Sequence, residues 1–579
     1  MIKIRPTYLK RALAGAIFGL YMAHLLYYLN PQIDITPGRL LLVTLAYGLI
    51  CGFLLGTTLW LLRVLRVRLF GRPDEVEYRP HGFGYVVAAA FFSAAVYWAH
   101  LIFFKIYLPP GAVRILSKAT TLIGATAFLL FVIWIIERNA GRTVSNILLG
   151  GAVLLIAISA FFLYQRRDRY HEDERALVVA NVAVAESRPV VVLAVRSLPY
   201  DWLLTLSGEG NLPFFSRMQR EAFVDRLEPF PSTSSKALWA SLVTGKLPYR
   251  HGVTGRFSYK TPLTGPTDRF QILPSWVGFR AWGLIPPVTR ISASLPSGDS
   301  LPVWAMFERI GVASAVIDWP SATPAGQQAS AVVGETFLRD PAATTAITKT
   351  VNVEELRALI RSAGTPDTTI ARRLQDLPQS QGDAIRTAIA RDQAVVAITS
   401  DLLKGHRFGL AMATLNSLGD SLSALRSVSN TLPEASTTRG AMIRSVIGEL
   451  DSLLGGLQKK LGAETTLVIV SPSGPVPPSL PATPIAALQE ILRFEDIGAN
   501  EGFVIISASG VLHRENPAPA HLIDVVPTIL FTAGLPIARD FDGTVLTDAF
   551  REEVLSTRSM SFVPSYEAPR FVVRHQQIP

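Results

Sequence analysis

The chain has 579 residues, 49% of them hydrophobic, and a mean hydropathy of +0.32, which excludes an ordinary soluble globular protein. Its formal net charge is +10, but much of that charge flanks apolar stretches, where basic residues anchor membrane helices beside anionic lipid. We therefore expect membrane lipids, and no nucleic acid, among its partners. The only cysteine, Cys51, lies within one of these stretches, so the rest of the chain forms no disulfide within itself.

Five apolar stretches in the first 165 residues are long enough to cross a membrane, which takes about 20 residues. They lie at about 11–29, 40–62, 83–107, 119–136 and 146–164. No small-residue cleavage site follows the first stretch, so we do not interpret it as a cleaved signal peptide. The sequence predicts a transmembrane domain of about five helices over residues 1–165.

The distribution of Lys and Arg predicts the orientation, because cytoplasmic loops are enriched in both residues. The N-terminus and the second loop are basic, whereas the first loop carries only Arg39. The N-terminus is therefore expected in the cytoplasm, and five spans would place the remaining chain outside. We predict an integral plasma (inner) membrane protein with an extracytoplasmic, or periplasmic, C-terminal domain.

A change of pattern follows the membrane stretches. Residues 166–187 are first charged and then weakly apolar, and we interpret them as a linker. From residue 188 short apolar runs bounded by turns alternate with helical patterns, which is typical of buried parallel strands joined by helices. The expected strands are 188–195, 313–318, 409–415, 465–471 and 502–507, and helices are expected at 236–244 and 441–462.

These elements predict an α/β domain over residues 188–579, with a doubly wound, mostly parallel sheet. Its length is sufficient to bury a full core. The segments 257–300 and 336–400 supply no obvious strand, and we interpret them as cap or insertion.

Four stretches in this domain together resemble the alkaline phosphatase superfamily, specifically its type I phosphodiesterase/nucleotide pyrophosphatase branch. They are VVVLAVRSLPYDWLLTLSGEGNLP (190–213), EPFPSTSSKALWASLVTGKLPYRHGV (228–253), VIDWPSATPA (316–325) and HLIDVVPTILFTAGLPIARDFDGTVLTDAF (521–550). The resemblance lies in their pattern and order, and it spans most of the domain.

The resemblance implies a two-metal site for phosphoryl or sulfuryl transfer, with Asp and His ligands at strand ends and a Ser or Thr nucleophile. The position of the first metal-binding Asp is held by Arg196, and the nucleophile position by Ser235. The next ligand pair, a carboxylate and a His, falls on Asn416 and Asp420.

The other implied ligand positions lack metal-binding side chains. An Asp-His pair expected after the next strand falls on Pro472 and Ser473, and a His expected within 495–502 is absent. Asn416 and Asp420 are thus polar remnants of a degenerate site, and we expect no metal and no other cofactor. The alternative is one or two divalent ions, zinc or manganese. His251 is interpreted as a packing residue.

The side chain at the first strand end, Arg196, is a cation. We expect Arg196, Ser235, Lys236 and the free N–H groups of the following helix to form an anion site. A guanidinium in place of a metal would bind phosphate or sulfate without activating a nucleophile. In the alternative interpretation Ser235 only caps its helix, and Asn416 and Asp420 are loop or capping residues.

Together these features predict a membrane-anchored pseudoenzyme, an anion- or glycan-binding, scaffolding or regulatory module at the cell envelope. Its expected ligand bears phosphate, sulfate or glycan. The alternative is an active metal-dependent phosphodiesterase, sulfatase or lipid phospho-headgroup transferase with Ser235 as nucleophile. The layout of five helices before such a domain also resembles lipoteichoic acid synthases and lipid phosphoethanolamine transferases. A third interpretation is a structural subunit that binds an envelope protein partner.

Overall fold

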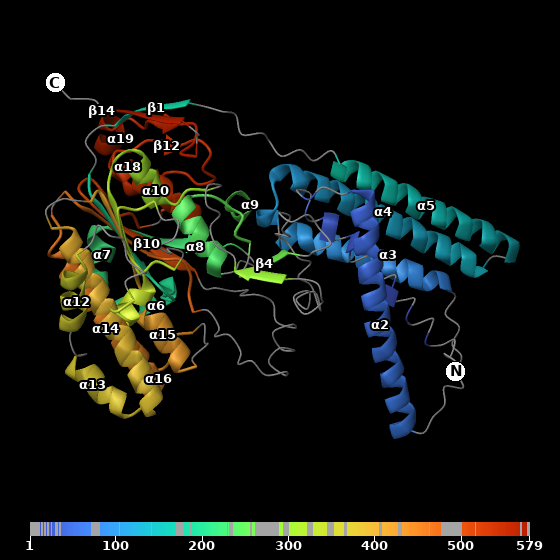
Figure 1. Ribbon diagram of the computed structural model, residues 1–579, viewed down its shortest axis with the longest axis horizontal. Coiled ribbons are helices and arrows are strands. Elements are labelled where there is room, and N and C mark those ends of the chain that lie inside the picture. Colours follow the sequence, from blue (N-terminus) through green and yellow to red (C-terminus); the bar gives the residue numbers. More distant parts are fainter. Residues whose placement is uncertain are drawn as a thin grey trace. The chain divides into compact units, whose positions relative to one another are not determined.

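The computed structural model shows a chain that forms two units (Figure 1). One comprises residues 1–174, 257–292 and 482–494, and the other comprises 175–256, 293–481 and 495–579. Besides scattered positions before residue 36, the structure describes residues 36–70, 82–103, 105–139, 142–168, 179–184, 188–228, 230, 235–254, 257–260, 289–292, 300–320, 328–343, 352–363, 367–404, 408–426, 431–462, 464–475, 501–515, 517–567 and 570–575.

The first unit is mainly helical. Its described helices are α2 (Pro37–Phe70), α3 (Gly82–Phe103), α4 (Pro110–Asn139) and α5 (Arg142–Asp168), and it includes the antiparallel strands β4 (Phe257–Lys260) and β5 (Thr289–Ser292). Large apolar side chains lie exposed along these helices, as Leu49 and Ile147 show. Such a surface suits contact with lipid rather than water.

Three of the five expected spans are confirmed as helices long and apolar enough to cross a membrane. These are Leu40–Leu62, Pro110–Asn139 and Thr143–Gln165. The stretch expected at 83–107 forms α3, but its apolar part, Val86–Ile102, is shorter. The stretch at 11–29 lies largely outside the described residues. The described residues thus give three such helices, not five, and the orientation stays a prediction from the Lys and Arg distribution.

The second unit is built on a sheet of eight described strands, in the order β11-β3-β10-β9-β2-β8-β6-β7. Their bounds are β2 (Val190–Val195), β3 (Phe223–Glu228), β6 (Ser314–Ile317), β7 (Ala331–Val333), β8 (Leu410–Leu415), β9 (Thr466–Ser471), β10 (Gly502–Ser507) and β11 (Ala520–His521). All five predicted strands are confirmed. However, β10 runs antiparallel to both β3 and β9, so the sheet is mixed although mostly parallel.

Helices cover both faces of this sheet, as an unbroken apolar strand pattern requires. In β2 the alternate residues Val191, Leu193 and Val195 pack into one core and Val190, Val192 and Ala194 into the other. The first core contains α6 (Tyr200–Gly208), α7 (Pro213–Glu221), α12 (Val353–Ser362), α13 (Thr368–Gln375), α14 (Gln379–Leu402), α15 (Ser417–Ala424) and α16 (Thr438–Gln458). The second contains α8 (Ser235–Thr244), α10 (Val303–Arg309) and α18 (Val525–Thr532).

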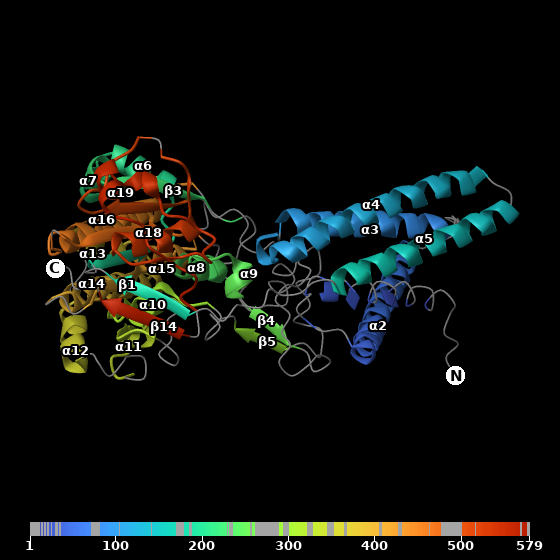
Figure 2. The same ribbon diagram turned by 90° about the horizontal axis from the view of Figure 1, so that it is seen from above.

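The linker segment and one of the two segments interpreted as insertion, 336–400, contribute to this unit, whereas the other, 257–300, forms the paired strands β4 and β5 of the first unit. Strand β1 (Val179–Val184), inside the segment 166–187, pairs in parallel with β14 (Arg570–His575), and Figure 2 shows the two side by side. The segment 336–400 contains α12, α13 and most of α11 (Glu335–Arg339) and α14. Of these helices, α14 packs against β6 and β8. This packing brings residues of α14 to the ends of those strands.

Candidate functional site at the strand ends

The carboxyl ends of β2, β8 and β6 meet at one edge of the sheet, because the three strands are adjacent and parallel. Two residues close to these strand ends have positive backbone φ angles: Ser197, two residues after β2, at 71°, and Asp318, directly after β6, at 55°. This left-handed backbone is uncommon outside glycine and is costly to hold, and such corners concentrate at functional sites.

Arg196 follows β2 and forms an ion pair with Asp420 of α15. Its Nη1 donates to Asp420 Oδ1 at 3.2 Å, and its side chain is 42% exposed. The stem of Arg196 lies against Gly419, where an added Cβ would be 3.0 Å from Arg196 Cδ. Glycine at this position therefore gives the arginine room to reach Asp420.

A second guanidinium, from Arg391 of α14, lies at the same edge. Its Nη2 donates to Asp318 Oδ1 at 2.5 Å, and the two side chains are 8% and 0% exposed. Its Nη1 lies 3.4 Å from Glu335 Oε1 and 3.7 Å from Asp420 Oδ2. Asp420 thus connects the two arginines.

Asn416 and Asp392 complete the network. The Asn416 side-chain amide donates to Asp318 Oδ2 at 3.1 Å, while the backbone N–H groups of Asn416 and Ser417 donate to the Asp392 carboxyl at 2.8 and 2.9 Å. Burial raises the pKa of Asp318 to about 6, against the opposing effect of its bonds from Arg391 and Asn416, so Asp318 is mainly ionised at neutral pH. Burial raises the pKa of Asp392 to about 7.

The sequence analysis missed Arg391, Asp318 and Asp392. Asp318 carried a signal, since it ends an apolar run just as Arg196 does. The two residues from α14 carried none, because a polar face on a long helix is ordinary and its packing on β6 and β8 is not visible in the sequence.

The remaining predicted site residues belong to other elements of the described chain. Ser235 is the first residue of α8, and Lys236, exposed, is the second. Pro472 and Ser473 follow β9, and Ser473 is buried. The segment 495–500 lies outside the described residues. The Arg196 side chain contacts Asp420 and Gly419 of α15.

The donor set at this edge does not fit the two-metal centre that the resemblance implies. Among the described residues, no group of three or more His, Cys, Asp and Glu side chains gathers in a metal-binding arrangement. The oxygens of Asp318 already accept bonds from Arg391 and Asn416. A divalent cation here would also meet two guanidinium charges, which repel it.

His251 is a packing residue, as predicted. It is fully buried, its Nε2 lies 2.9 Å from Ser241 Oγ, and its Nδ1 accepts the backbone N–H of Val253 at 3.1 Å. Burial lowers its pKa to about 3, so the ring is neutral. A neutral histidine satisfied on both ring nitrogens serves the turn after α8 and takes no part in the strand-end network.

Another charged cluster fixes the segment after α8. Lys246 is 4% exposed, and its Nζ donates to Asp540 Oδ2 at 2.8 Å and to Glu567 Oε2 at 2.7 Å. Glu567 also accepts the backbone N–H of Leu301 at 2.9 Å. These bonds join three distant parts of the chain, so the cluster has a structural function.

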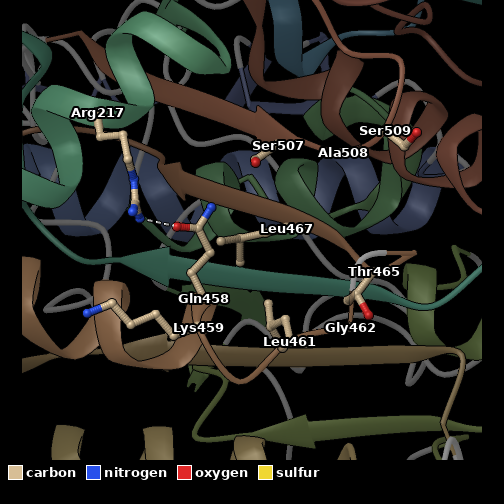
Figure 3. A pocket seen from close by; sticks show the side chains of 10 residues that line it. All are labelled: Arg217, Gln458, Lys459, Leu461, Gly462, Thr465, Leu467, Ser507, Ala508 and Ser509. Carbon is tan, nitrogen blue, oxygen red and sulfur yellow. Dashed lines mark hydrogen bonds between the residues drawn. The ribbon is translucent and has the colours of Figure 1, made fainter.

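A pocket of about 370 Å³ lies at the opposite edge of the sheet (Figure 3). It is lined by residues at the amino end of β9, the carboxyl end of β10 and the end of α16. Arg217 points toward Gln458 and donates to its side-chain oxygen. The described lining contains no Asp, Glu, His or Cys, so it offers no general base and no metal ligand set.

Several comparisons relate this chain to known proteins. Curated proteins gave no significant match. Among solved structures, phosphonoacetate hydrolase from Sinorhizobium meliloti shares 15% identity over 50% of this chain and 57% of its own, with a TM-score of 0.32. The chain therefore spans less than two thirds of that hydrolase. The alkaline phosphatase PafA shares 12% identity over 64% of this chain and 100% of its own, with a TM-score of 0.40.

Murine ectonucleotide pyrophosphatase/phosphodiesterase 5 shares 12% identity over 60% of this chain and 96% of its own, with a TM-score of 0.36. The family is shown by a different comparison. The family model for type I phosphodiesterase/nucleotide pyrophosphatase matches residues 190–528, which is more than half of the chain. The chain therefore belongs to the type I phosphodiesterase/nucleotide pyrophosphatase family.

Proposed function

We propose that this chain is a membrane-anchored, catalytically inactive member of its family, with the phosphodiesterase-like domain outside the plasma membrane as a binding or scaffolding module. The observation that carries the proposal is the ion pair between Arg196 and Asp420. It joins two positions where the family resemblance calls for metal ligands. A phosphoryl-transfer site of this kind depends on cations that activate the nucleophile and neutralise charge on the leaving group.

The proposed ligand is an anionic group, phosphate or sulfate, alone or on a lipid headgroup or glycan. Arg196 has five N–H donors, its bond to Asp420 uses one of them, and its side chain is 42% exposed. Ser235 and Lys236, with the N–H groups at the start of α8, are proposed to contribute from the second face of the sheet. Binding of this kind needs no activated nucleophile.

We expect the full chain, purified in mild detergent and exposed to zinc and manganese, to retain no stoichiometric metal in elemental analysis. Hydrolysis of bis(p-nitrophenyl) phosphate is expected to be the same for the wild type and Ser235→Ala, because Ser235 has no metal to activate it. Retained metal, together with turnover lost in Ser235→Ala, would instead establish a hydrolase or transferase with Ser235 as nucleophile.

For the ligand, Arg196→Asp is expected to weaken binding of inorganic phosphate and of glycerol 3-phosphate by about tenfold or more, because a charge-assisted hydrogen bond contributes about 1.5–3 kcal/mol. Equilibrium dialysis of the full chain in detergent measures both affinities, and the second ligand represents a lipid headgroup. Arg220→Asp, on the exposed side of α7, makes the same charge change elsewhere and should leave both unchanged. Equal binding by the wild type and Arg196→Asp would exclude an anion site at Arg196.

A further inference from the structure

The pocket at the amino end of β9 is lined by cations without a carboxylate to balance them. Arg217 of α7 and Lys459, the residue after α16, both line it, and no Asp or Glu is among its described lining residues. Its volume of about 370 Å³ lies within the range of about 300–1,000 Å³ that is typical of small-molecule sites. A concave site with positive charge of this kind favours an anionic ligand.

Arg217 is held at the pocket wall by the protein itself. Its Nη2 donates to the side-chain oxygen of Gln458, and its Cζ lies 5.8 Å from the centroid of the Phe214 ring. Glu221 Oε2 lies 3.9 Å from Arg217 Nε, but the Glu221 side chain is 63% exposed, so water screens its charge. The bond to Gln458 occupies Nη2 and leaves Nη1 to donate to a ligand. A guanidinium fixed in this way loses little conformational entropy when an anion binds.

The end of α16 beside the pocket does not cancel this positive charge. Free carbonyl groups give a helix C-terminus a partial negative charge. Here the carbonyl groups of Leu457 and Gln458 accept the backbone N–H groups of Lys460 and Leu461 at 2.8 and 3.2 Å. Because these bonds use the carbonyl oxygens within the turn, the helix end adds little repulsion toward an anion.

Hydroxyl groups form much of the remaining polar lining. Ser507 ends β10, Ser509 follows it, and Thr465 precedes β9. Figure 3 shows Arg217 and Lys459 on the left of the pocket and Thr465 and Ser509 on the right. A hydroxyl group both donates and accepts, so it pairs well with the hydroxyl groups of a polyol. The pocket therefore has a cationic side and a hydroxyl-bearing side.

We propose that this pocket binds a phosphate monoester of a small polyol, such as a sugar phosphate. A phosphate monoester has a charge of about −1.5 to −2 at pH 7, which the two cations Arg217 and Lys459 match. A sulfate monoester or a phosphate diester carries a single negative charge and suits the pair less well. Arg217 and Lys459 contact the phosphate oxygens, and Thr465 and Ser509 contact the polyol.

This site is separate from the one proposed at Arg196, because the pocket lies at the opposite edge of the sheet. Neither inference depends on the other. The test is isothermal titration of the full chain in mild detergent with glucose 6-phosphate. Arg196→Gln serves as the background, so that the site proposed at Arg196 adds little to the signal. Saturable binding is expected, with glucose and glucose 6-sulfate at least about tenfold weaker. No saturable binding, or equal binding of glucose 6-sulfate, would overturn the proposal.

Two substitutions locate the phosphate. In the same background, Arg217→Met and Lys459→Met should each weaken binding of glucose 6-phosphate by about tenfold or more, because each removes a charge-assisted bond. The matched controls are Arg220→Met and Lys460→Met, exposed neighbours outside the described lining, which should bind like the background. Thermal unfolding checks that each variant folds. If Arg217→Met does not, Lys459→Met at its exposed position gives the same test. Lining variants that bind as tightly as their controls would overturn the site.

A further pair of substitutions locates the polyol. Thr465→Val combined with Ser509→Ala should weaken glucose 6-phosphate severalfold and leave binding of inorganic phosphate unchanged, because only the sugar loses partners. An equal loss for both ligands would contradict this orientation. Glucose 6-phosphate binding that is present in the wild type and absent in Arg196→Gln would belong to the Arg196 site and overturn the pocket. Metal-dependent hydrolysis would overturn the inactive domain and leave the pocket standing.

Discussion

Replacing Lys246 with Met is expected to lower the free energy of unfolding by about 3–5 kcal/mol, because removing one partner of a buried ion pair leaves its counter-charge without compensation. The Nζ of Lys246 lies 2.7 Å from Glu567 and 2.8 Å from Asp540, and the Lys246 and Glu567 side chains are each 4% exposed. Met keeps most of the volume of the lysine stem, so the loss reports on charge rather than on packing.

Urea denaturation of the full chain in mild detergent measures this loss. Lys404→Met is the control, since Lys404 pairs with Asp401 at the surface and is 74% exposed. A surface pair of this kind contributes about 0–1 kcal/mol. Adding Glu567→Gln to Lys246→Met should recover part of the loss. Equal sensitivity of Lys246→Met and Lys404→Met to urea would contradict the structural function of this cluster.

The second large effect is a pH dependence of the free energy of unfolding, and it comes from the carboxyl group of Asp392. Burial raises the pKa of its carboxyl from 3.8 to about 7, and Asp318 is a nearby negative charge that acts in the same direction. The folded chain therefore keeps a proton that the unfolded chain releases above pH 4. The stability contributed by this group is complete below the unfolded pKa and is lost as the pH rises through about 7.

Asp392→Asn removes this titration and leaves an oxygen that still accepts one of the two backbone N–H groups. From pH 4 to pH 7 the unfolding free energy of the wild type is expected to fall by roughly a few kcal/mol relative to that of the variant. The size follows because one pKa unit corresponds to about 1.4 kcal/mol. Denaturation curves at several pH values measure it. Asp376→Asn, exposed at the end of α13, should follow the wild type. Parallel curves for wild type and Asp392→Asn would refute the prediction.

Much of the fold was predictable because burial on both faces gives a strand an unbroken apolar run. The runs that became β2, β6, β8 and β9 were predicted as parallel strands, and they are parallel. The run that became β10 looks the same in the sequence but is antiparallel. Strand direction depends on which neighbour the strand pairs with after a connection, and composition does not record that choice.

The membrane region shows a similar division. Length and hydropathy predicted spans at 40–62, 119–136 and 146–164, and the helices Leu40–Leu62, Pro110–Asn139 and Thr143–Gln165 contain them. They also predicted a span over 83–107, where the apolar part of the helix is shorter, Val86–Ile102. An apolar run predicts that a segment is buried away from water. It does not predict the residues at which the helix begins and ends, because these depend on local backbone geometry.

At the site, the sequence by itself determined that a cation, Arg196, stands at the first strand end, because that position is read directly from the chain. Only the tertiary structure decided how this charge is balanced, since Asp420 reaches Arg196 from a distant element and also lies 3.7 Å from Arg391. The physical reason is that an ion pair depends on distances of a few ångströms. Such distances between remote residues are set by helix packing on the sheet, not by sequence order.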